Sequence, residues 1–454
     1  MWNGKNFDEH ADNTTAGMKP VGIILDKTNF YSEMGGQVAD KGELQLLGGS
    51  AVFKVEDTQS FGGYVVHIGR VTRGKFSVGS DVMCHINNQF RAKVASNHTM
   101  THVLNYALRE VLEGDADQRG SLVNDEKLRF DFTHNQPVSA EEIAKVEDIV
   151  NHQIKQDLTV YADLAPLNKA QHIAGLRAVF GETYPDPVRV VSIGIEIDQL
   201  IGNPENDAWT SASIEFCGGT HIESTSHAKR FALLSEDGIA KGIRRITAIT
   251  CDDAIAAHAL ADMLEAKADG LTKHGAENLQ SAHVELTKEV EGATLPAPRK
   301  NAIRAKLADV QKQLKELSKA AAAEQAKKAQ QLAAGIASSA ASSTEEIVIA
   351  SLELGSDRKA LEAAMSTITA ANPNKAIMLL SPDHGEGRVA LMASVPQGIV
   401  GRGLKAGDWI REVAGVMGGK GGGRPDNAQG SGQDISKLKD ATARARTFAF
   451  GQIS

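Results

Sequence analysis

Two pairs of metal-binding residue types, each spaced by four, constrain this chain more than any other feature. His98 and His102 lie in SNHTMTHVL, and Cys217 and His221 lie in FCGGTH, after the strand-like run SASIEF. On a helix, this spacing places two side chains on one face, one turn apart. Imidazole nitrogens and a thiolate suit zinc, and four such ligands complete a tetrahedral set. The pairs together predict one Zn²⁺ site formed by segments far apart in sequence, rather than two unconnected pairs.

The chemistry of such a site stays open at the level of sequence. If three residues bind, the fourth position is free for water or substrate; if His221 also binds, the site is closed, as structural zinc sites are. Zinc can generate hydroxide, polarise a carbonyl or hold a substrate in place. In a competing interpretation, Cys217 is a nucleophile and His221 is its base, but His98 and His102 then have no role.

Length and composition limit the remaining functions. The chain has 454 residues, enough for two to four domains, with a net charge of −8 and 5% aromatic residues. These values argue against diffuse, charge-driven nucleic-acid binding and against base stacking as the main mode, so RNA contacts need local basic patches. Three cysteines make no disulfide framework and favour a reducing compartment. We find no signal peptide and no apolar run of about 18 residues, and therefore expect a cytoplasmic protein without a membrane span.

Hydrophobic periodicity predicts an α+β fold class with four domains. Residues 1–92 contain short strands separated by glycine and polar clusters, which favour a small β-barrel. Residues 93–252 form the zinc-binding domain, an antiparallel sheet with helices on one face. A helical period starts at Asn97, and a later helix begins after Ser139, which can form a capping box with Glu142.

Residues 253–340 predict a two-helix antiparallel coiled-coil hairpin followed by a linker. Leu264, Leu271, Leu279 and Leu286 stand seven or eight residues apart, a second apolar series follows TLPAPR, and the linker is ASSAASST. Such a repeat can close on itself or on a second chain, so a homodimer through the coiled coil or the C-terminal domain stays open. Residues 341–454 alternate strands and helices and predict a compact α/β domain that is the last of the four.

Five segments of the chain resemble the alanyl-tRNA synthetase family. NHTMTHVLNYALREVL, EFCGGTHI, FYSEMGGQVADKGEL and AKGIRRITAIT are similar to its editing domain, and GGKGGGRPDNAQGSG to its C-terminal tRNA-binding domain. The resemblance is eukaryotic-like in its details and covers nearly the whole chain in the family's order. No segment resembles the family's ATP-dependent aminoacylation core. The resemblance therefore implies the C-terminal half of a synthetase, with a free-standing trans-editing deacylase as the alternative.

The function that this resemblance implies is zinc-dependent editing. An aminoacyl-tRNA deacylase would hydrolyse the ester that joins serine or glycine to tRNA(Ala), and its parent chain would be an alanine–tRNA ligase. A pocket sized for alanine rejects glycine, or an added hydroxyl, only weakly, so a second site is needed. The hypothesis from a different class is a non-catalytic tRNA-binding module with a structural zinc.

Polar residues in and beside FYSEMGGQ are candidates for substrate recognition and catalysis. Thr28 and Gln37 can hydrogen-bond the serine hydroxyl, which alanine lacks; alternatively, Gly-Gly is only a hairpin turn and Gln37 a surface amide. Asp40 and Glu33 can serve as general base, or are solvated turn carboxylates. Thr99 and Thr101, between the two histidines, can reach the pocket or cap neighbouring backbone.

A glycine-rich segment near the C-terminus is the main candidate for RNA contact. Its glycines expose backbone N–H groups beside two cations, which suits phosphate, although a flexible connector is the alternative. By resemblance, this domain binds the outer corner of the tRNA. The segment also resembles the accessory domain of DHH-type phosphoesterases, whose Asp-His-His catalytic domain is not visible here. An arginine pair can meet the acceptor stem, or be a sheet-edge charge pair. The residues assigned to tRNA are Lys420, Gly421, Gly422, Gly423, Arg424, Arg244 and Arg245.

Overall fold

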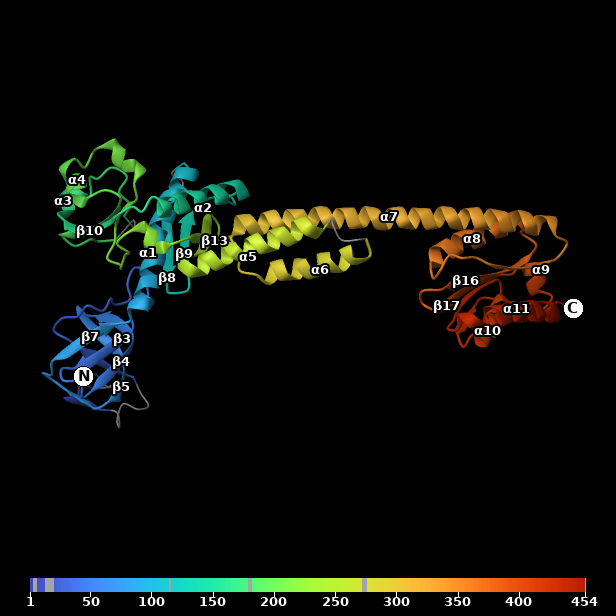
Figure 1. Cartoon of the computed structure of the whole chain (residues 1–454), viewed down its shortest axis with the longest axis horizontal. Coiled ribbons are helices and arrows are strands. Elements are labelled where there is room, and N and C mark those ends of the chain that lie inside the picture. The colour runs from blue at the N-terminus through green and yellow to red at the C-terminus, as the bar shows by residue number, and fades with distance from the viewer. Residues whose placement is uncertain (3–5, 13–19, 114–115, 179–181, 272–275, 454) are drawn as a thin grey trace. The chain divides into compact units, whose positions relative to one another are not determined.

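The computed structural model describes residues 1–453 except 3–5, 13–19, 114–115, 179–181 and 272–275. The chain divides into two compact units, Met1–Val310 and Gln311–Ser454. The boundary lies inside the long helix α7 (Ala297–Ser342). The four predicted domains are a finer division and stay a prediction. The mixture of helices and several mainly antiparallel sheets confirms the α+β class (Figure 1).

Short strands build the N-terminal region of the first unit. An antiparallel sheet has the order β2-β5-β4-β3-β7, and β1 pairs with β6. Leu44, Phe53 and Phe76 lie in its apolar core. Among the described residues no strand pair joins β2 to β7, so the closed barrel stays a prediction. The strands are β1 (His10–Asp12), β2 (Val21–Ile24), β3 (Gly42–Leu46), β4 (Val52–Phe61), β5 (Tyr64–Arg73), β6 (Lys75–Ser77) and β7 (Val82–Ile86).

Two helices and two sheets follow in the same unit. The helix α1 (Asn88–Val111) begins nine residues before the predicted Asn97, because the side chain of Asn87 caps it by accepting from the N–H of Phe90. In α2 (Ala140–Lys155) the predicted capping box of Ser139 and Glu142 is confirmed. The remaining elements are β8 (Gln118–Val123), β9 (Leu128–Thr133), β10 (Val160–Ala165), α3 (Leu167–Ala170), β11 (Val188–Ile193), α4 (Ile197–Gly202), β12 (Ile214–Phe216), β13 (Phe231–Ala240) and β14 (Ile243–Thr250).

The predicted single sheet with helices on one face is wrong in two respects. The strands form a four-stranded sheet, β13-β14-β9-β8, and a separate three-stranded one, β10-β11-β12. Alternate residues of β13 pack into different cores: Phe231 and Leu233 join α1 and α2, whereas Ala232 packs with α5 (Cys251–Gly270). Since side chains alternate across a strand, helices cover both faces of the four-stranded sheet.

The described part of the next region has three helices, so the predicted two-helix hairpin is wrong. The leucine series is buried but is divided between α5 and α6 (Ala276–Gly292), because the helix ends at Gly270. Ion pairs join Arg299 of α7 to Asp262 of α5, and the ring of His283 on α6 contacts the carbonyl of Leu307 on α7. The apolar repeat thus packs α5, α6 and the start of α7 together.

The second unit contains a five-stranded sheet covered on both faces. Its order is β15-β16-β17-β19-β18, with β15 parallel to β16 and the other pairs antiparallel. Figure 1 shows α8 and α10 on opposite sides of the sheet. The elements are β15 (Ile347–Ser351), α8 (Arg358–Ala371), β16 (Ala376–Asp383), β17 (Arg388–Ser394), α9 (Gln397–Val400), α10 (Ala406–Val416), β18 (Lys420–Gly423), β19 (Asn427–Gly432) and α11 (Leu438–Gln452).

The predicted Ala/Ser linker is helical instead. The helix α7 continues through ASSAAS to Ser342, and its Ala329, Ala333 and Ala337 lie in the same apolar core as α8. Alanine has the highest helix propensity, and one small residue per turn allows close packing. Among the helices of the described residues, none is both long and apolar enough to cross a membrane.

Candidate metal centre

The two predicted pairs meet in one buried cluster. The potential ligand atoms of His98, His102, Cys217 and His221 all lie within 4.8 Å of one another. The ring centroids of the three histidines are 4.6–5.2 Å apart. His98 and His102 occupy successive turns of α1, whereas Cys217 and His221 lie in an irregular loop after β12, not on a helix. The two pairs therefore converge as predicted, but only His98 and His102 lie on a helix.

Gln37 determines the orientation of the first histidine. Its Oε1 accepts a hydrogen bond from the backbone N–H of Thr220 (2.9 Å) and lies 2.6 Å from Nδ1 of His98, while its Nε2 donates to the Thr220 hydroxyl. A backbone N–H can only donate, so Oε1 is an acceptor and Nδ1 of His98 carries the proton. Nε2 of His98 therefore presents a lone pair toward Cys217 Sγ, 3.4 Å away.

Thr99 determines the orientation of His221 in the same way. Its hydroxyl donates to the carbonyl of Ala95 and accepts from the N–H of Ile222, and it lies 3.1 Å from Nδ1 of His221. Because the hydroxyl proton is used on Ala95, Nδ1 of His221 is the donor. Nε2 of His221 is buried without a hydrogen-bond partner. Thr99 thus caps neighbouring backbone, as one prediction stated, and also contacts a candidate ligand.

The donor set fits a zinc ion. Tetrahedral geometry with ordinary Zn–N and Zn–S distances needs N···N separations of about 3.3 Å and N···S separations of about 3.6 Å. The distance of 3.4 Å between Nε2 of His98 and Sγ of Cys217 agrees with this value. The largest separation among the four ligand atoms, up to 4.8 Å, is somewhat wider than in a zinc site with all four ligands bound. The buried, unpartnered Nε2 of His221 is the atom that a metal would satisfy.

Burial favours the neutral form of every ligand. It lowers the pKa of His102 to about 3 and the pKa values of His98 and His221 well below the ordinary value, with neighbouring positive charge, including that of Arg189, adding to the effect. Burial raises the pKa of the Cys217 thiol to about 11. Neutral imidazoles are ready to ligate, whereas binding of a divalent cation would displace the Cys217 proton.

Arg189 holds the loop that carries Cys217. Its Nη1 donates to the carbonyls of Cys217 (3.0 Å) and Gly219 (2.7 Å) from the neighbouring strand β11. Gly219 lies so close to His98 that a Cβ there would meet its Cε1 at 2.0 Å. Only glycine fits at this position without moving a ligand. The sequence contained no signal for Arg189, because its role arises from the pairing of β11 with β12.

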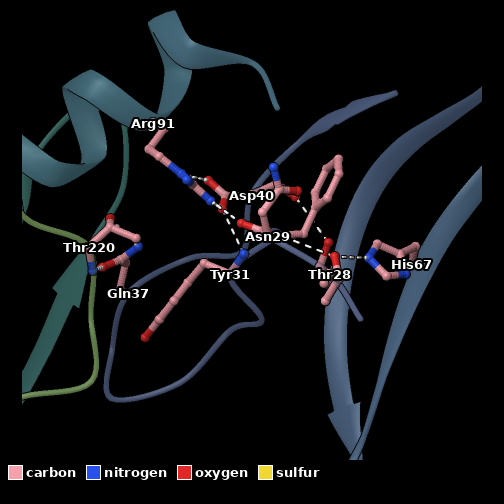
Figure 2. A network of polar contacts seen from close by, with 10 residues as sticks. Thr28, Asn29, Tyr31, Gln37, Asp40, His67, Arg91 and Thr220 are labelled. Carbon is pink, nitrogen blue, oxygen red and sulfur yellow. Dashed lines mark hydrogen bonds and ion pairs between the residues drawn. The ribbon is translucent and has the colours of Figure 1, made fainter. Parts of the chain in front are cut away.

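The segment that carries Gln37 is anchored to α1. Gly35 and Gly36 have positive φ and form a turn bridged by Met34 and Gln37, yet Gln37 is only 1% exposed and is not the surface amide of the alternative. Asp40 is buried in an ion pair with Arg91 of α1 and accepts from the N–H of Tyr31, as Figure 2 shows. Neither prediction for Asp40 fits, because this carboxylate is not solvated and is committed to a salt bridge.

Glu33 and Thr28 lie elsewhere in this segment. Glu33 is exposed and accepts from Gln59, as a solvated turn carboxylate would. Thr28 Oγ1 accepts from the N–H of Phe30 and lies 2.8 Å from Nε2 of the buried His67 (Figure 2). Nδ1 of His67 donates to the carbonyl of Ile23. Among the described residues no hydrogen bond links Thr28 to the four candidate ligands.

The glycine-rich segment is ordered as a strand. Lys420–Gly423 is β18, paired with β19 at the sheet edge, which contradicts the alternative of a flexible connector. A Cβ on Gly421 would lie 2.4 Å from Ile410 Cγ2, so this glycine allows α10 to approach the strand. Lys420 and Arg424 are exposed, and among the described residues neither has an ion pair. They remain available to an anionic partner.

The arginine pair is engaged within the protein. Arg244 forms an ion pair with Glu236, and both Nε and Nη2 of Arg245 bond the carboxylate of Asp131 at 2.7 Å. Both partners lie on strands that neighbour β14. Both arginines thus form charge pairs within the sheet, as the alternative expected, but β14 is an interior strand and not the expected sheet edge. Contact with the acceptor stem stays a prediction.

Three family models match parts of the chain. The model described as "tRNA synthetases class II (A)" matches residues 4–90, which include Thr28 and Gln37. "Threonyl and Alanyl tRNA synthetase second additional domain" matches residues 188–247, which include Cys217 and His221. "DHHA1 domain" matches residues 344–449, which include the glycine-rich strand.

Curated relatives match nearly the whole chain. It is 37% identical to the cytoplasmic alanine–tRNA ligase of Drosophila melanogaster over 98% of the chain and 47% of the relative. It is 40% identical to the cytoplasmic enzyme of Caenorhabditis elegans (95% of the chain, 45% of the relative) and 41% identical to the mitochondrial one of Saccharomyces cerevisiae (97% and 45%). All three sources are eukaryotic, in agreement with the eukaryotic-like resemblance. The chain spans about half the length of the curated relatives it matches.

A solved structure is also similar to part of the chain. The C-Ala domain of Aquifex aeolicus alanyl-tRNA synthetase covers 24% of this chain and 90% of its own length, at 22% identity and a TM-score of 0.21. A likeness at this level carries no inference on the fold or the function.

Proposed function

Because the chain belongs to the alanyl-tRNA synthetase family, we propose that it is a zinc-dependent editing deacylase with a C-terminal tRNA-binding domain. Its substrates would be tRNA(Ala) mischarged with serine or glycine. The observation that carries this proposal is the convergence of three histidines and one cysteine in one cluster, in which the free lone pairs of His98 and His221 are directed inward.

Zinc, when bound, would supply positive charge that holds or polarises the aminoacyl ester. If all four residues bind, no coordination position is left for the ester or for water, and zinc would act on the substrate only through its charge; if three bind, the open position can take either. The chain's own residues keep the ligands in place: Gln37 and Thr99 hold two imidazoles, and Arg189 fixes the loop carbonyls. Asp40 is an unsuitable general base, because its carboxylate is paired with Arg91.

Recognition of the substrate would involve the segment that begins at Thr28. The Thr28 hydroxyl donates to His67, because Nδ1 of His67 already donates to a carbonyl. A serine hydroxyl would therefore meet Thr28 as an acceptor. Gln37 is less suited to read the substrate, because both of its amide groups are used by Thr220 and His98. We assign Gln37 to positioning His98.

Binding of tRNA would use Lys420 and Arg424 beside the glycine strand. Their exposure and the absence of a described ion pair support this role, whereas Arg444 and Arg446 of α11 are paired with Glu412 and Glu345. A homodimer, formed through the helices of residues 253–340 or through the C-terminal domain, stays an alternative in this proposal. The relatives include both cytoplasmic and mitochondrial enzymes, so a cytoplasmic location stays a prediction.

The test combines metal content with deacylation in one preparation. We expect about one zinc per chain and hydrolysis of Ser-tRNA(Ala) and Gly-tRNA(Ala), with Ala-tRNA(Ala) spared. Cys217→Ala should lose both zinc and activity, while Cys251→Ala, at a half-buried cysteine that begins α5, should keep both. Hydrolysis that persists without zinc would refute the metal's role.

The presence of four candidate protein ligands also favours a second candidate, a tRNA-binding module with a structural zinc. It predicts tRNA binding and one zinc per chain without turnover of any mischarged tRNA. The same preparation therefore separates the two functions.

A further inference from the structure

His102, the remaining histidine of the cluster, has a carboxylate near its Nδ1. Nδ1 of His102 is buried and lies 3.5 Å from Oε2 of Glu215, too far for a good hydrogen bond, and it has no other partner. Glu215 is on β12, two residues before Cys217, and is 8% exposed. The ligand strand therefore delivers both Cys217 and this carboxylate to the cluster.

Two further contacts fix this arrangement. Oε1 of Glu215 accepts from Nδ2 of Asn105, one turn beyond His102 on α1, at 2.9 Å. The hydroxyl of Ser213, also in the segment around β12, donates to the carbonyl of His102 at 3.2 Å. These two bonds join the helix to the segment around β12 next to His102, and Oε2 of Glu215 is the oxygen that lies near its ring.

Within the part of the chain that the structure describes, Glu215 is the only carboxylate that faces a candidate ligand imidazole. His98 and His221 face a neutral amide and a neutral hydroxyl. A carboxylate that accepts from the outer N–H of a ligating histidine fixes its tautomer and raises its basicity. Its negative charge also offsets part of the charge of a bound cation in a buried site.

We propose that Glu215 is a positioning residue that accepts the Nδ1–H of His102 and thereby directs Nε2 of this ring to the metal. The proposal rests on the metal site of the proposed function. A short movement of the ring on metal binding would close the 3.5 Å gap. Glutamine cannot replace the carboxylate, because Asn105 and His102 face different oxygens of Glu215 and an amide would place its NH₂ toward one of these two donors.

The experiment compares Glu215→Gln with Glu223→Gln in the full chain. Glu223 is the matched control, because it also lies two residues from a ligand and is exposed. Zinc affinity is measured by competition with a chelating indicator, and Co²⁺ replaces zinc for visible spectroscopy. We expect Glu215→Gln to bind zinc 10- to 100-fold more weakly, on the order of the usual outer-partner effect, with shifted Co²⁺ bands, and Glu223→Gln to match wild type. Equal affinities and spectra in the three proteins would overturn the proposal.

A measurement on the wild-type chain covers a variant that does not fold. In zinc-loaded protein labelled with ¹⁵N-histidine, His102 should carry its proton on Nδ1, with Nε2 bound to metal; the opposite tautomer would overturn the assignment. None of these measurements uses tRNA. A wild-type chain that binds no zinc would end the proposed function as well, whereas a wild-type chain that binds zinc normally while Glu215→Gln does too would end only the role of Glu215.

Discussion

The assignment of Gln37 to His98 makes a prediction that separates it from a substrate-reading role. In Gln37→Leu, the Nδ1–H of His98 and the backbone N–H of Thr220 lose their common acceptor at a side chain that is 1% exposed. An unpaired buried donor costs about 1–3 kcal/mol, so the two together weaken the folded site by about 2–6 kcal/mol. We expect zinc affinity to fall by about 10- to 100-fold, which corresponds to about 1.4–2.7 kcal/mol.

The matched control is Gln37→Glu. Its carboxylate keeps an acceptor for His98 and for the N–H of Thr220, and the Thr220 hydroxyl can rotate to donate to the second oxygen. This variant should bind zinc nearly as well as wild type. Folding of both variants is followed by circular dichroism and zinc binding by chelator competition.

Deacylation kinetics decide between the two roles of Gln37. A residue that only holds a ligand should, on substitution by leucine, reduce hydrolysis of Ser-tRNA(Ala) and Gly-tRNA(Ala) by the same factor. A residue that reads the serine hydroxyl should affect the serine substrate alone and leave zinc affinity unchanged. The second pattern would refute the reasoning from the hydrogen bonds.

Three further predictions follow from single contacts. Gly219→Ala places a Cβ 2.0 Å from His98 Cε1 and should reduce zinc content, whereas Gly218→Ala, which meets only Met34 Cε at 3.2 Å, should not; equal zinc content in both would contradict the packing. Burial raises the pKa of Glu147 from 4.5 to about 7. As pH rises between these values, the unfolded chain loses this proton before the folded chain does, so the free energy of unfolding of the wild type falls by about 3 kcal/mol. Glu147→Gln, which can still accept the N–H of Leu233, should remove this loss in urea titrations; His258, 3.9 Å away, is common to both proteins, and a pH-independent difference would refute the assignment. Lys420→Ala and Arg424→Ala should each weaken tRNA binding and reduce its salt dependence by about one counterion, measured by filter binding. Lys359→Ala on α8 is the control, and an equal effect there would show that the glycine strand is not the contact.

The features that the sequence predicted correctly are those that depend on residues close together in the chain. The capping box of Ser139 and Glu142 depends on four consecutive residues, and the leucine series depends on helical spacing, so both could be read from the sequence. The HxxxH pair was predictable for the same reason. The division of the leucines between α5 and α6 was not, because the sequence pattern continued across the break after Gly270.

Contacts across the fold could not be read in this way. Arg189 and Glu215 act through the pairing of β11 with β12, and Gln37 reaches Thr220 over a separation of 183 residues. Nothing in the neighbouring residues identifies these partners. For Gln37, the residue type and its glycine turn correctly indicated a site, but the turn alone could not show that its amide would be used on a ligand rather than left for a substrate.

X-ray absorption at the zinc edge of the purified chain tests the central claim most directly. We expect one zinc per chain with one sulfur ligand at about 2.3 Å and three nitrogen ligands at about 2.0–2.1 Å, and loss of the sulfur shell in Cys217→Ser. A shell made only of oxygen and nitrogen, or a chain that holds no zinc, would contradict the convergence of the two segments on one metal.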